Sequence, residues 1–538
     1  MADYSPPAHQ GGQQPIWRWW GVSLLLAVGL VLFFFHLGGY ALIDPDEPVY
    51  GETAREMIVL GDWLSPHMDF RPWFDKPIFF YWLTILSFKF FGISEFAARF
   101  WSALLALGGT FLTYRFGVFL FGSRRQALLA ALILATSFEF IVMARASVTD
   151  MTLTFFMSGA LFLFYLGFSE PGARGAYWGI YPLCALATLT KGPMGTLLPL
   201  GIIGLFLLLT RRLGEVRRMH AIPGGLLLVG LVAPWYVAMY YLHGVEFGNS
   251  FLIQYNVGRF LQPEHVHRPY LYYVPILILG LFPWGAFFPV VLYRTVRRWR
   301  DPRLLFPLVW VCVIFFFFSA AESKLPSYIL PLFPAAALLL GSAWWHPGDE
   351  GPPDPPMVWA SAGTPLLGAA LILLPLLSTQ LLDRYPKAVQ ATGLLGSLLL
   401  VLGILVLAFL VRRRWEQAFA LQVVLMALFI PLVLLRVMPE AERYASTRSL
   451  ARLVARPADS GAEVASFRYY RPSMTFYSQK VVQRIERDEA LANFLGSGRR
   501  VYCFIKRKSL DDFQQAYPGT PVHRLGDEGG LVLISNRG

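Results

Sequence analysis

Five carboxylates stand close together directly after the first apolar segment of the chain. Asp44, Asp46, Glu47, Glu52 and Glu56 fall within 13 residues, although only 15% of the protein is charged. Acids beside a membrane helix are costly unless they are hydrated, paired or used in chemistry. Such a carboxylate can serve as a general base or orient an acceptor. The alternative is an acidic loop that ends the helix and faces water, and the stretch alone does not decide between the two.

Two prolines restrict the backbone of this acidic stretch. A residue before a proline is pushed towards extended geometry. Pro45 and Pro48 therefore predict that Asp44 and Glu47 lie outside regular helix. Asp46 is then expected on a stiff, non-helical turn, with a short helix beginning just after it.

A second acid, Asp150, begins a later apolar span. An acid in the first turn of a helix is often explained by the helix dipole. The functional interpretation is that Asp46 and Asp150 face one cavity from two helix ends that are distant in sequence. One carboxylate would act as the base or orient an acceptor, and the other would stabilise charge.

Four basic residues, Lys76, Lys191, Arg259 and Lys324, stand near expected helix ends. A lysine at a helix end commonly extends its charge towards water, which is the structural alternative for each one. Several cations near helix starts are also the pattern expected for a phosphate or diphosphate. Acids and cations together suit a reaction in which a sugar phosphate leaves, because the cations take up the charge that develops on the phosphate.

A metal site is less clearly indicated. Asp75, His265 and His267 offer a carboxylate and imidazoles, which can bind a divalent ion. No spacing here matches a zinc motif, and hydrated loop residues are the alternative. No cofactor is therefore assigned, while a divalent metal that involves Asp75 stays open.

The composition indicates a polytopic α-helical membrane protein. The 538 residues are 56% hydrophobic and 16% aromatic, with a net charge of +12 and a mean hydropathy of +0.50. Long apolar runs of this kind exclude an ordinary soluble protein. Cys184, Cys312 and Cys503 offer neither a disulfide framework nor a zinc pattern. Thirteen apolar segments are predicted to span the membrane: 16–37, 96–121, 125–144, 151–167, 176–189, 193–209, 222–242, 271–293, 304–320, 326–345, 358–377, 391–411 and 415–437.

Basic connectors predict the orientation of these spans, because arginine-rich short loops favour the cytoplasm. The four connectors share one side only if 77–92 does not cross, so we interpret that segment as a helix in the outer interface. The N-terminus is then inside and the C-terminus outside, and the first span is a retained anchor. All candidate site residues fall on the outer face, which predicts a water-filled cavity that opens outwards. The connectors are 124–125, 211–218, 294–303 and 412–414.

Two domains are expected. Residues 1–438 form a transmembrane module with an outer-face loop at 39–95, and residues 439–538 form a soluble α/β domain on the outer side. In this second domain, strands are predicted at 463–467, 500–505 and 531–534, and helices at 488–495 and 510–517. No internal repeat is visible, which disfavours many transporter folds.

Several motifs appear along the chain in a familiar order. This order resembles the GT-C polyprenyl-phosphate-dependent glycosyltransferases, namely the lipid-A aminoarabinose transferases and the protein O-mannosyltransferase clan. The motifs are Asp46-Glu47-x-x-Tyr50-x-Glu52, Asp75-Lys76-Pro77, Ser147-x-x-Asp150, Thr190-Lys191-Gly192-Pro193, Ser323-Lys324-Leu325-Pro326-x-Tyr328 and Tyr469-Tyr470-x-Pro472-Ser473-x-x-Phe476-Tyr477.

The resemblance implies a GT-C fold of about thirteen transmembrane helices with interfacial helices and an outer α/β domain. It implies that Asp46 and Asp150 are the catalytic aspartates. It also implies residues that bind the carrier phosphate or line the cavity: Lys76, Lys191, Arg259, Tyr328, Lys324, Tyr50 and Glu47.

Three positions depart from the aminoarabinose enzymes. Val49 stands where those enzymes usually carry arginine, Asp75 where they often have glutamate, and Asn256 where they often have histidine. The reaction class is therefore better supported than the sugar, and the metal site stays open.

We therefore predict transfer of a sugar from a polyprenyl phosphate, as undecaprenyl phosphate, to lipid A or another envelope acceptor, with inversion. The enzyme would be a monomer in the bacterial inner membrane, would face the periplasm, and would have no nucleic-acid partner. The alternatives are a protein O-mannosyltransferase and, from another class, a lipid or sugar transporter or flippase. Of the five clustered acids, Asp46 is the expected catalytic residue and Glu47 supports the turn. Asp44, Glu52 and Glu56 are expected to be ordinary hydrated acids.

Overall fold

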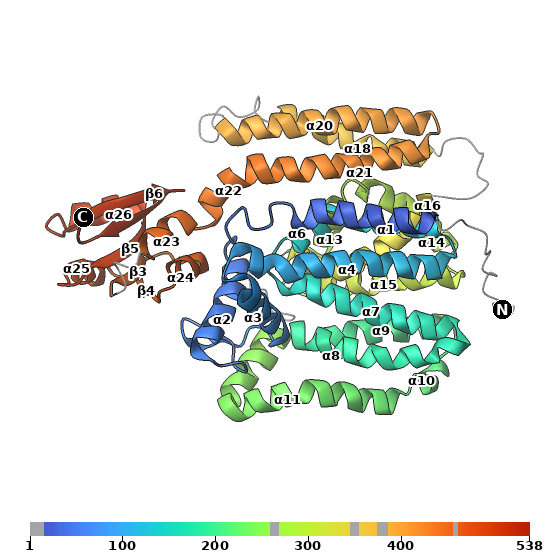
Figure 1. Cartoon of the computed structure of the whole chain (residues 1–538), viewed down its shortest axis with the longest axis horizontal. Helices are drawn as coiled ribbons and strands as arrows, with labels where there is room; N and C mark the ends of the chain where they lie inside the picture. Colours follow the sequence, from blue (N-terminus) through green and yellow to red (C-terminus); the bar gives the residue numbers. More distant parts are fainter. Residues whose placement is uncertain (1–15, 259–267, 345–354, 374–385, 456–460) are drawn as a thin grey trace. The chain divides into compact units, whose positions relative to one another are not determined.

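The structure is a computed structural model of the chain and describes residues 16–258, 268–344, 355–373, 386–455 and 461–538 (Figure 1). It divides into two compact units. The helical unit comprises Met1–Phe35, Phe74–Phe80 and Trp101–Val433, and the mixed unit comprises His36–Trp73, Tyr81–Phe100 and Leu434–Gly538. The domain boundary expected between residues 438 and 439 stays a prediction.

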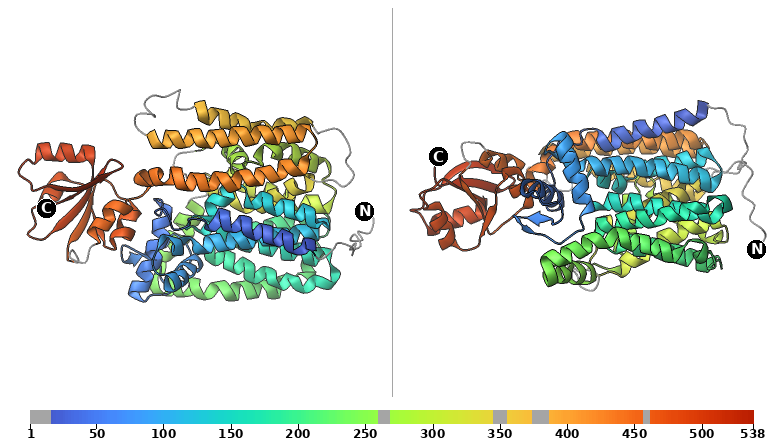
Figure 2. Two further views of the ribbon diagram at one scale, coloured as in Figure 1. Left: turned by 45° about the horizontal axis from the view of Figure 1, so that its top comes forward. Right: turned by 60° about the horizontal axis from the view of Figure 1, so that its bottom comes forward.

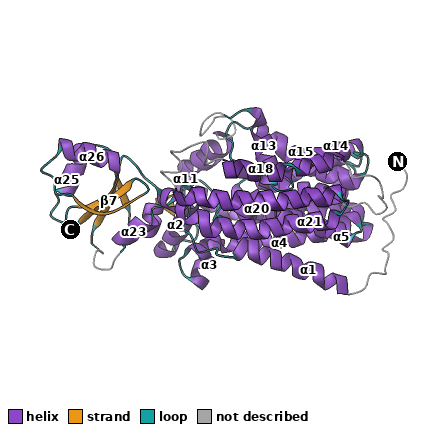
Figure 3. Ribbon diagram, turned by 90° about the horizontal axis from the view of Figure 1, so that it is seen from above, coloured by secondary structure: helices purple, strands orange, loops and turns teal. Residues whose placement is uncertain are grey.

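Helices that run alongside one another make up the helical unit (Figures 1 and 3). Its first half contains α1 (Ile16–Gly29), η1 (Leu30–Phe34), most of α4 (Glu95–Phe121), α5 (Arg124–Ala135), α6 (Phe138–Ala144), α7 (Thr149–Ser169), η2 (Pro171–Gly179), α8 (Ile180–Lys191), α9 (Met194–Leu209), α10 (Glu215–Arg218), α11 (Ala221–Phe247) and η3 (Gly248–Gly258). Its second half contains η4 (Tyr270–Tyr272), α13 (Tyr273–Gly280), η5 (Gly285–Phe287), α14 (Phe288–Arg297), α15 (Pro302–Ala320), η6 (Pro326–Leu332), α16 (Phe333–Trp344), α17 (Pro355–Ser361), α18 (Gly363–Leu373), α20 (Pro386–Val411), α21 (Trp415–Leu432) and the start of η8 (Val433–Val437).

The chain is a multi-pass membrane protein. Within the described residues, eight helical segments are long and apolar enough to cross a bilayer, or nine if the bent pair α5–α6 counts as one span. Four shorter apolar helices accompany them, and the expected count of thirteen crossings stays a prediction. The eight segments are Glu95–Phe121, Thr149–Ser169, Ala221–Phe251, Pro302–Ala320, Pro326–Trp344, Pro355–Leu373, Val389–Val411 and Trp415–Ala445.

The structure interrupts two of the expected spans. The span expected at 125–144 is bent by 65° between α5 and α6. At the bend, the Thr136 and Ser137 hydroxyls donate to the carbonyls of Leu132 and Ile133, and hydroxyl bonding of this kind bends helices. The span expected at 271–293 is broken between α13 and α14, where Pro283 has no N–H to continue the helix.

The mixed unit combines helices with a five-stranded sheet, shown from two further sides in Figure 2. The strand order is β4-β3-β5-β7-β6, in which β4, β3 and β5 are parallel and β7 and β6 are antiparallel to their neighbours. The elements are α2 (Asp46–Leu60), β1 (His67–Met68), β2 (Arg71–Pro72), α3 (Phe79–Phe91), the start of α4, α22 (Met438–Ala445), α23 (Arg448–Val454), β3 (Glu463–Phe467), α24 (Pro472–Ser478), β4 (Val482–Ile485), α25 (Asp488–Leu495), β5 (Val501–Lys506), α26 (Arg507–Ala516), β6 (His523–Glu528) and β7 (Leu531–Ser535).

An apolar core joins α25 and α26 to one face of the sheet. It includes Phe467 and Ile505 from the strands and Leu491, Leu495 and Phe513 from the two helices. β5 and β7 are buried along almost their whole length, as expected for strands covered on both faces. The strand predicted at 463–467 and the helix predicted at 488–495 have the observed bounds, and the elements predicted at 500–505, 510–517 and 531–534 are confirmed within three residues. β4 and β6 were missed.

The backbone of the acidic stretch differs from the prediction. Asp46 is the first residue of α2, and Glu47 lies inside the helix, so the expected non-helical turn ends at Pro45. Pro48 is tolerated because the first N–H groups of a helix have no partner within that helix. The contacts of the Glu47 side chain, described below, outweigh the extended preference of a residue before proline.

Candidate functional site

The turn that leads into α2 is held by segments from the far end of the chain. The Leu42 N–H donates to the Tyr477 hydroxyl at 2.7 Å, and the Asp44 N–H donates to the Ala445 carbonyl at 2.9 Å. The Asp44 carboxylate accepts from both the N–H and the hydroxyl of Ser473. We call residues 41–46 the acidic turn. Asp44 is therefore no ordinary hydrated acid, as had been expected, but fixes this turn to α24.

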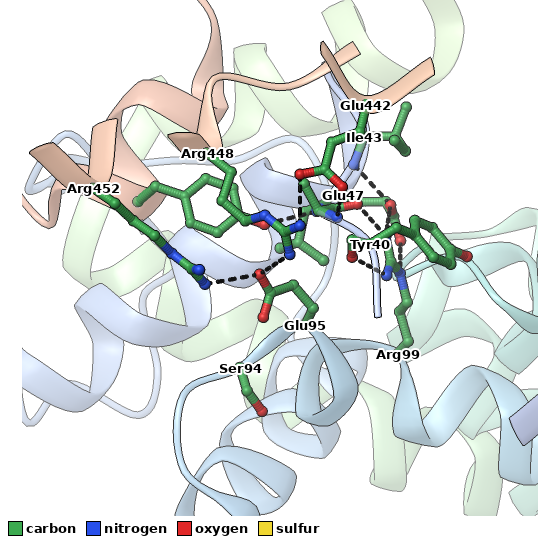
Figure 4. A network of polar contacts seen from close by, with 12 residues as sticks. Tyr40, Ile43, Glu47, Ser94, Glu95, Arg99, Glu442, Arg448 and Arg452 are labelled. Atoms are coloured by element: carbon green, nitrogen blue, oxygen red, sulfur yellow. Dashed lines mark hydrogen bonds and ion pairs between the residues drawn. The ribbon is translucent and has the colours of Figure 1, made fainter. Parts of the chain in front are cut away.

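A buried ion pair supports the acidic turn from inside. Arg99 is fully buried, and its Nε and Nη2 atoms lie 2.7 Å from the two carboxylate oxygens of Glu47 (Figure 4). Glu47 also accepts from the Ile43 N–H at 2.8 Å. The remaining donors of Arg99 reach the carbonyls of Leu37, Tyr40 and Ala41. The pair is bidentate and saturated with hydrogen bonds, which is the condition under which a buried charge pair is stable.

A second layer of charges surrounds this pair. Arg448 pairs with both Glu95 and Glu442, and Arg452 also reaches Glu95 (Figure 4). Glu442 accepts in addition from the Ala41 N–H at 3.1 Å. Glu442 therefore links the backbone of Ala41 to a charge network that also includes α4 and α23.

The outcome of these contacts is a rigid support for an exposed carboxylate. Asp46 is exposed, whereas Glu47 beside it is buried. Tyr50, one turn further along α2, is also buried and packs against the ring of Tyr81 at 6.0 Å. The geometry fits the expectation that Glu47 supports the turn. The catalytic role of Asp46 and substrate contacts of Glu47 and Tyr50 stay predictions.

Two more acids on α2 differ from the prediction that they are ordinary hydrated acids. Glu52 and Glu56 are fully buried and not hydrated. Glu52 pairs with Arg55 through two hydrogen bonds of 2.7 and 2.6 Å, and Glu56 accepts from the Phe70 N–H at 2.8 Å. Burial, with a smaller contribution from the neighbouring Glu52, raises the pKa of Glu56 to about 8, although Phe70 and Arg55 lower it. The sequence pattern did not show this, because the chain that covers these acids comes from the β1–β2 hairpin.

In the helical unit, three of the expected site residues meet. Asp150 is the second residue of α7 and Lys191 is the last residue of α8, and their carboxylate and ammonium lie 2.6 Å apart. The Lys191 ammonium also lies 4.8 Å from the ring centre of Tyr328, in η6. Asp150 is buried and Lys191 is half-buried. The Lys191 cation therefore lies where the end of α8 meets the start of α7, with an acid and a tyrosine beside it.

Lys324 is buried close to the same helix, η6, but its ammonium is used by the backbone. It donates to the carbonyls of Ala321 and Arg268. The Tyr273 hydroxyl donates to the Leu325 carbonyl at 3.1 Å, so the segment that enters η6 is tied on both sides. The Lys324 ammonium thus holds the backbone before η6. Its expected contact with a substrate stays a prediction.

Asp75 and Lys76 form an ion pair of their own at 2.9 Å. Phe74, just before them, packs on the rings of His243 and Phe247 in α11, which positions this short segment. The described residues contain no group of three or more His, Cys, Asp or Glu that could hold a metal ion. Arg259, His265 and His267 lie outside the described residues, so the expected metal is not tested.

Sequence reasoning missed Arg99 and Glu139. Both are ionisable residues within expected apolar spans, which is a signal for function or for a buried pair. Arg99 forms the pair with Glu47. Glu139, in α6, is 9% exposed, lies near Asp150, and has a buried Oε1 atom with no hydrogen-bond partner in the part of the chain that the structure describes.

The buried acid Glu56 predicts a pH-dependent stability. The folded protein keeps this proton up to about pH 8, whereas the unfolded chain releases it near the ordinary glutamate pKa of 4.5. The contribution of Glu56 to the free energy of unfolding is therefore fully present below pH 4.5. It is lost as the pH rises towards 8, by up to about 1.4 kcal/mol per pH unit. Glu56→Gln mimics the protonated acid and should flatten this slope.

The measurement is the apparent melting temperature of the detergent-solubilised protein between pH 5 and pH 9. Glu489→Gln, at an exposed acid of α25, is the matched control and should keep the wild-type slope. An identical slope in the Glu56→Gln protein would show that this acid is not protonated in the folded state.

The ion pair between Asp150 and Lys191 predicts a coupled effect on stability. Lys191→Met leaves a buried carboxylate without its cation and should destabilise the protein by about 3 kcal/mol. Adding Asp150→Asn removes the stranded charge and should restore most of that loss. Thermal unfolding of the two single variants and the double variant measures the coupling.

Arg125→Met serves as a control for this cycle, because Arg125 pairs with Glu416 at an exposed position and should cost less than about 1 kcal/mol. Additive effects of Lys191→Met and Asp150→Asn would contradict the pairing.

Comparison with known proteins agrees with this architecture. The family model described as dolichyl-phosphate-mannose-protein mannosyltransferase matches residues 17–247. An undecaprenyl phosphate-alpha-4-amino-4-deoxy-L-arabinose arabinosyl transferase of Aeromonas hydrophila is 33% identical over 325 residues, which is 59% of each chain. An uncharacterised protein of Aquifex aeolicus is 34% identical over 316 residues, covering 59% of this chain and 62% of the other. The chain thus spans about three fifths of the length of the curated relatives it matches.

The fold is similar over a greater length to a solved structure. The crystal structure of ArnT from Cupriavidus metallidurans bound to undecaprenyl phosphate has a TM-score of 0.83 and 25% sequence identity, and covers 96% of this chain and 98% of its own. The chain therefore has an ArnT-like GT-C fold and resembles ArnT and the mannosyltransferases of the matching family.

Proposed function

We propose that this protein is a membrane glycosyltransferase that moves a sugar from undecaprenyl phosphate to lipid A or another acceptor of the cell envelope. The observation that carries the proposal is the cation of Lys191, held by Asp150 and Tyr328 at helix ends of an ArnT-like fold. A cation in this setting suits a leaving phosphate. The solved ArnT structure with undecaprenyl phosphate supports the same carrier.

The proposed reaction is a displacement at the anomeric carbon of the donor sugar. An acceptor oxygen forms a bond to the anomeric carbon of the sugar, and the bond from that carbon to the phosphate oxygen breaks on the opposite side. The electron pair of the broken bond stays with the phosphate, whose charge the Lys191 ammonium stabilises. Asp46 orients the acceptor and takes the proton if the acceptor is a hydroxyl. The outcome is transfer with inversion.

The sugar we propose is aminoarabinose. The support comes from the name of the Aeromonas relative, which is 33% identical. Val49, Asp75 and Asn256 replace residues that are usual in such enzymes, so donor selection in this chain must depend partly on other side chains. Glu139, whose buried Oε1 atom has no hydrogen-bond partner among the described residues, is one residue that can contribute to it.

A transporter or flippase is less consistent with the positions of the charges. Transporters place their binding residues near the bilayer midplane on discontinuous helices. Asp150 and Lys191 instead occupy the first turn of α7 and the last turn of α8. Charges at helix ends fit a reaction at the membrane surface better than a transport path.

We also propose that the site faces the periplasm across the bacterial inner membrane. α9 begins beside Lys191 and ends just before Arg211 and Arg212, so its 16 residues place the two about 24 Å apart. The segments α10 and α14, which carry other arginines, lie at one end of the helical unit (Figure 1). The positive-inside rule assigns that end to the cytoplasm and hence the Lys191 end to the outer side.

The catalytic assignment predicts that Asp46→Asn reduces the rate of transfer at least about 100-fold, because it removes the proposed base. The fold should persist, since Asp46 is exposed and its charge adds only about 0.5 kcal/mol at a helix start. The measurement is transfer of labelled sugar from its polyprenyl carrier by the purified protein in detergent. Asp512→Asn, at an exposed acid of α26, is the matched control. Unchanged turnover of Asp46→Asn would remove this residue from the catalytic machinery.

The orientation predicts the side of the C-terminus. A reporter that is active only in the periplasm, fused after Gly538, should be active, because the proposed topology places this end outside. The same reporter fused after Arg414 should be inactive, since 412–414 is a basic connector. The reverse pattern in the two fusions would refute the orientation.

A further inference from the structure

The carboxyl edge of the sheet in the mixed unit carries a cluster of cations and tyrosines. β3 connects through α24 to β4 on one side, and β5 connects through α26 to β6 on the other. Adjacent parallel strands whose connections leave in opposite directions form a topological switch point, where open α/β sheets bind their ligands. The switch point of this sheet therefore lies between the carboxyl ends of β3 and β5 (Figure 1).

One tyrosine ring joins the two strand ends at this switch point. Tyr469 follows β3, and Lys506 ends β5, with its ammonium 4.2 Å from the ring centre of Tyr469. The Arg471 guanidinium lies 5.2 Å from the centre of the same ring. Two cations thus share one aromatic side chain, an arrangement that keeps their like charges close together.

Nearby acids do not neutralise these two cations. Asp488 pairs with Arg468, Asp527 with Arg507, and Asp69 with Arg484. Across the described segments, neither Lys506 nor Arg471 forms an ion pair with an acid. Arg471 does lie within electrostatic range of Asp44, whose carboxylate is already held by Ser473. The cluster of Tyr469, Arg471 and Lys506, which we call the switch-point cluster, therefore has a surplus positive charge.

We propose that the switch-point cluster binds a phosphate group carried on a sugar. An ammonium and a planar guanidinium together provide the point charge and the forked donors that a phosphate accepts. The tyrosine between them adds an apolar face and a hydroxyl, both of which suit a sugar ring. Nothing in the reaction proposed above uses these residues.

A short series of residues connects the switch-point cluster to the acidic turn. Arg471 is two residues from Ser473, which fixes Asp44, and Asp44 is two residues from Asp46. All of these residues belong to the mixed unit. A phosphorylated headgroup held here would lie beside the acidic turn, as an acceptor must. This last step, and only this step, rests on the proposed function.

The first test is calorimetric titration of the full-length protein in detergent with glucose 6-phosphate, with glucose as the uncharged control. Lys506→Met and Arg471→Met should each weaken binding of the phosphate at least about tenfold, the loss expected for one charge-assisted hydrogen bond. Lys508→Met removes an exposed lysine two residues along α26 and should leave the affinity unchanged. Equal affinity of the wild-type, Lys506→Met and Arg471→Met proteins would overturn the proposal, as would equal binding of glucose and glucose 6-phosphate.

A second comparison separates this site from the proposed carrier site. Binding that belongs to the switch-point cluster should persist in the Lys191→Met protein, and its complete loss there would assign the phosphate to the helical unit and overturn the proposal. Because these titrations need no turnover, their outcome does not depend on whether the proposed glycosyl transfer is correct. Vesicles that contain a phosphorylated glycolipid, compared with the same lipid after phosphatase treatment, distinguish a lipid headgroup from a soluble sugar phosphate.

Discussion

The buried ion pair between Arg99 and Glu47 is the constraint on which the proposed catalytic region depends. A guanidinium with no exposed surface is tolerated only because a bidentate carboxylate and three backbone carbonyls satisfy it. Two of those carbonyls, of Leu37 and Tyr40, lie just before the acidic turn, and the third belongs to its first residue, Ala41. One side chain of α4 therefore fixes both the backbone that enters α2 and the second residue of that helix. A catalytic group must be held within a fraction of an ångström, and the pair provides that rigidity for the exposed Asp46 next to it.

The acidic turn also depends on residues near the C-terminus, which are remote from it in sequence. Asp44 is bound by Ser473, 429 residues away, and Leu42 by Tyr477, 435 residues away. Burial raises the pKa of Asp44 to about 6, although the hydrogen bonds from Ser473 and the charge of Arg471 lower it. The region around the C-terminal sheet therefore contributes to the conformation of the acidic turn. Its helix α24 provides the partners that decide this conformation.

Part of this architecture was accessible from the sequence. The central strands β3, β5 and β7 were found because buried strands are continuous apolar runs. β4 and β6 were missed because they are the two edges of the sheet, where polar residues are retained and the pattern is weak. The acids Glu52 and Glu56 were misjudged because their burial depends on a hairpin that no local pattern indicates. Asp150 and Lys191 were chosen for their charge at expected helix ends and Tyr328 from the family resemblance, and the structure brings those three together.

The environments of the two expected catalytic aspartates differ enough to separate their roles. The Asp150 carboxylate is buried and bound to the Lys191 ammonium, so accepting a proton would cost it that ion pair. Asp46 is exposed at the start of α2, on a backbone that other residues hold in place. Carboxylates placed in unlike surroundings generally divide the work of an active site. Asp46 is thus the one suited to meet an acceptor, whereas Asp150 suits the task of holding the cation that a leaving phosphate requires. The prediction that one carboxylate meets the acceptor and the other stabilises charge thus gains an assignment of each role to one acid, which stays a proposal.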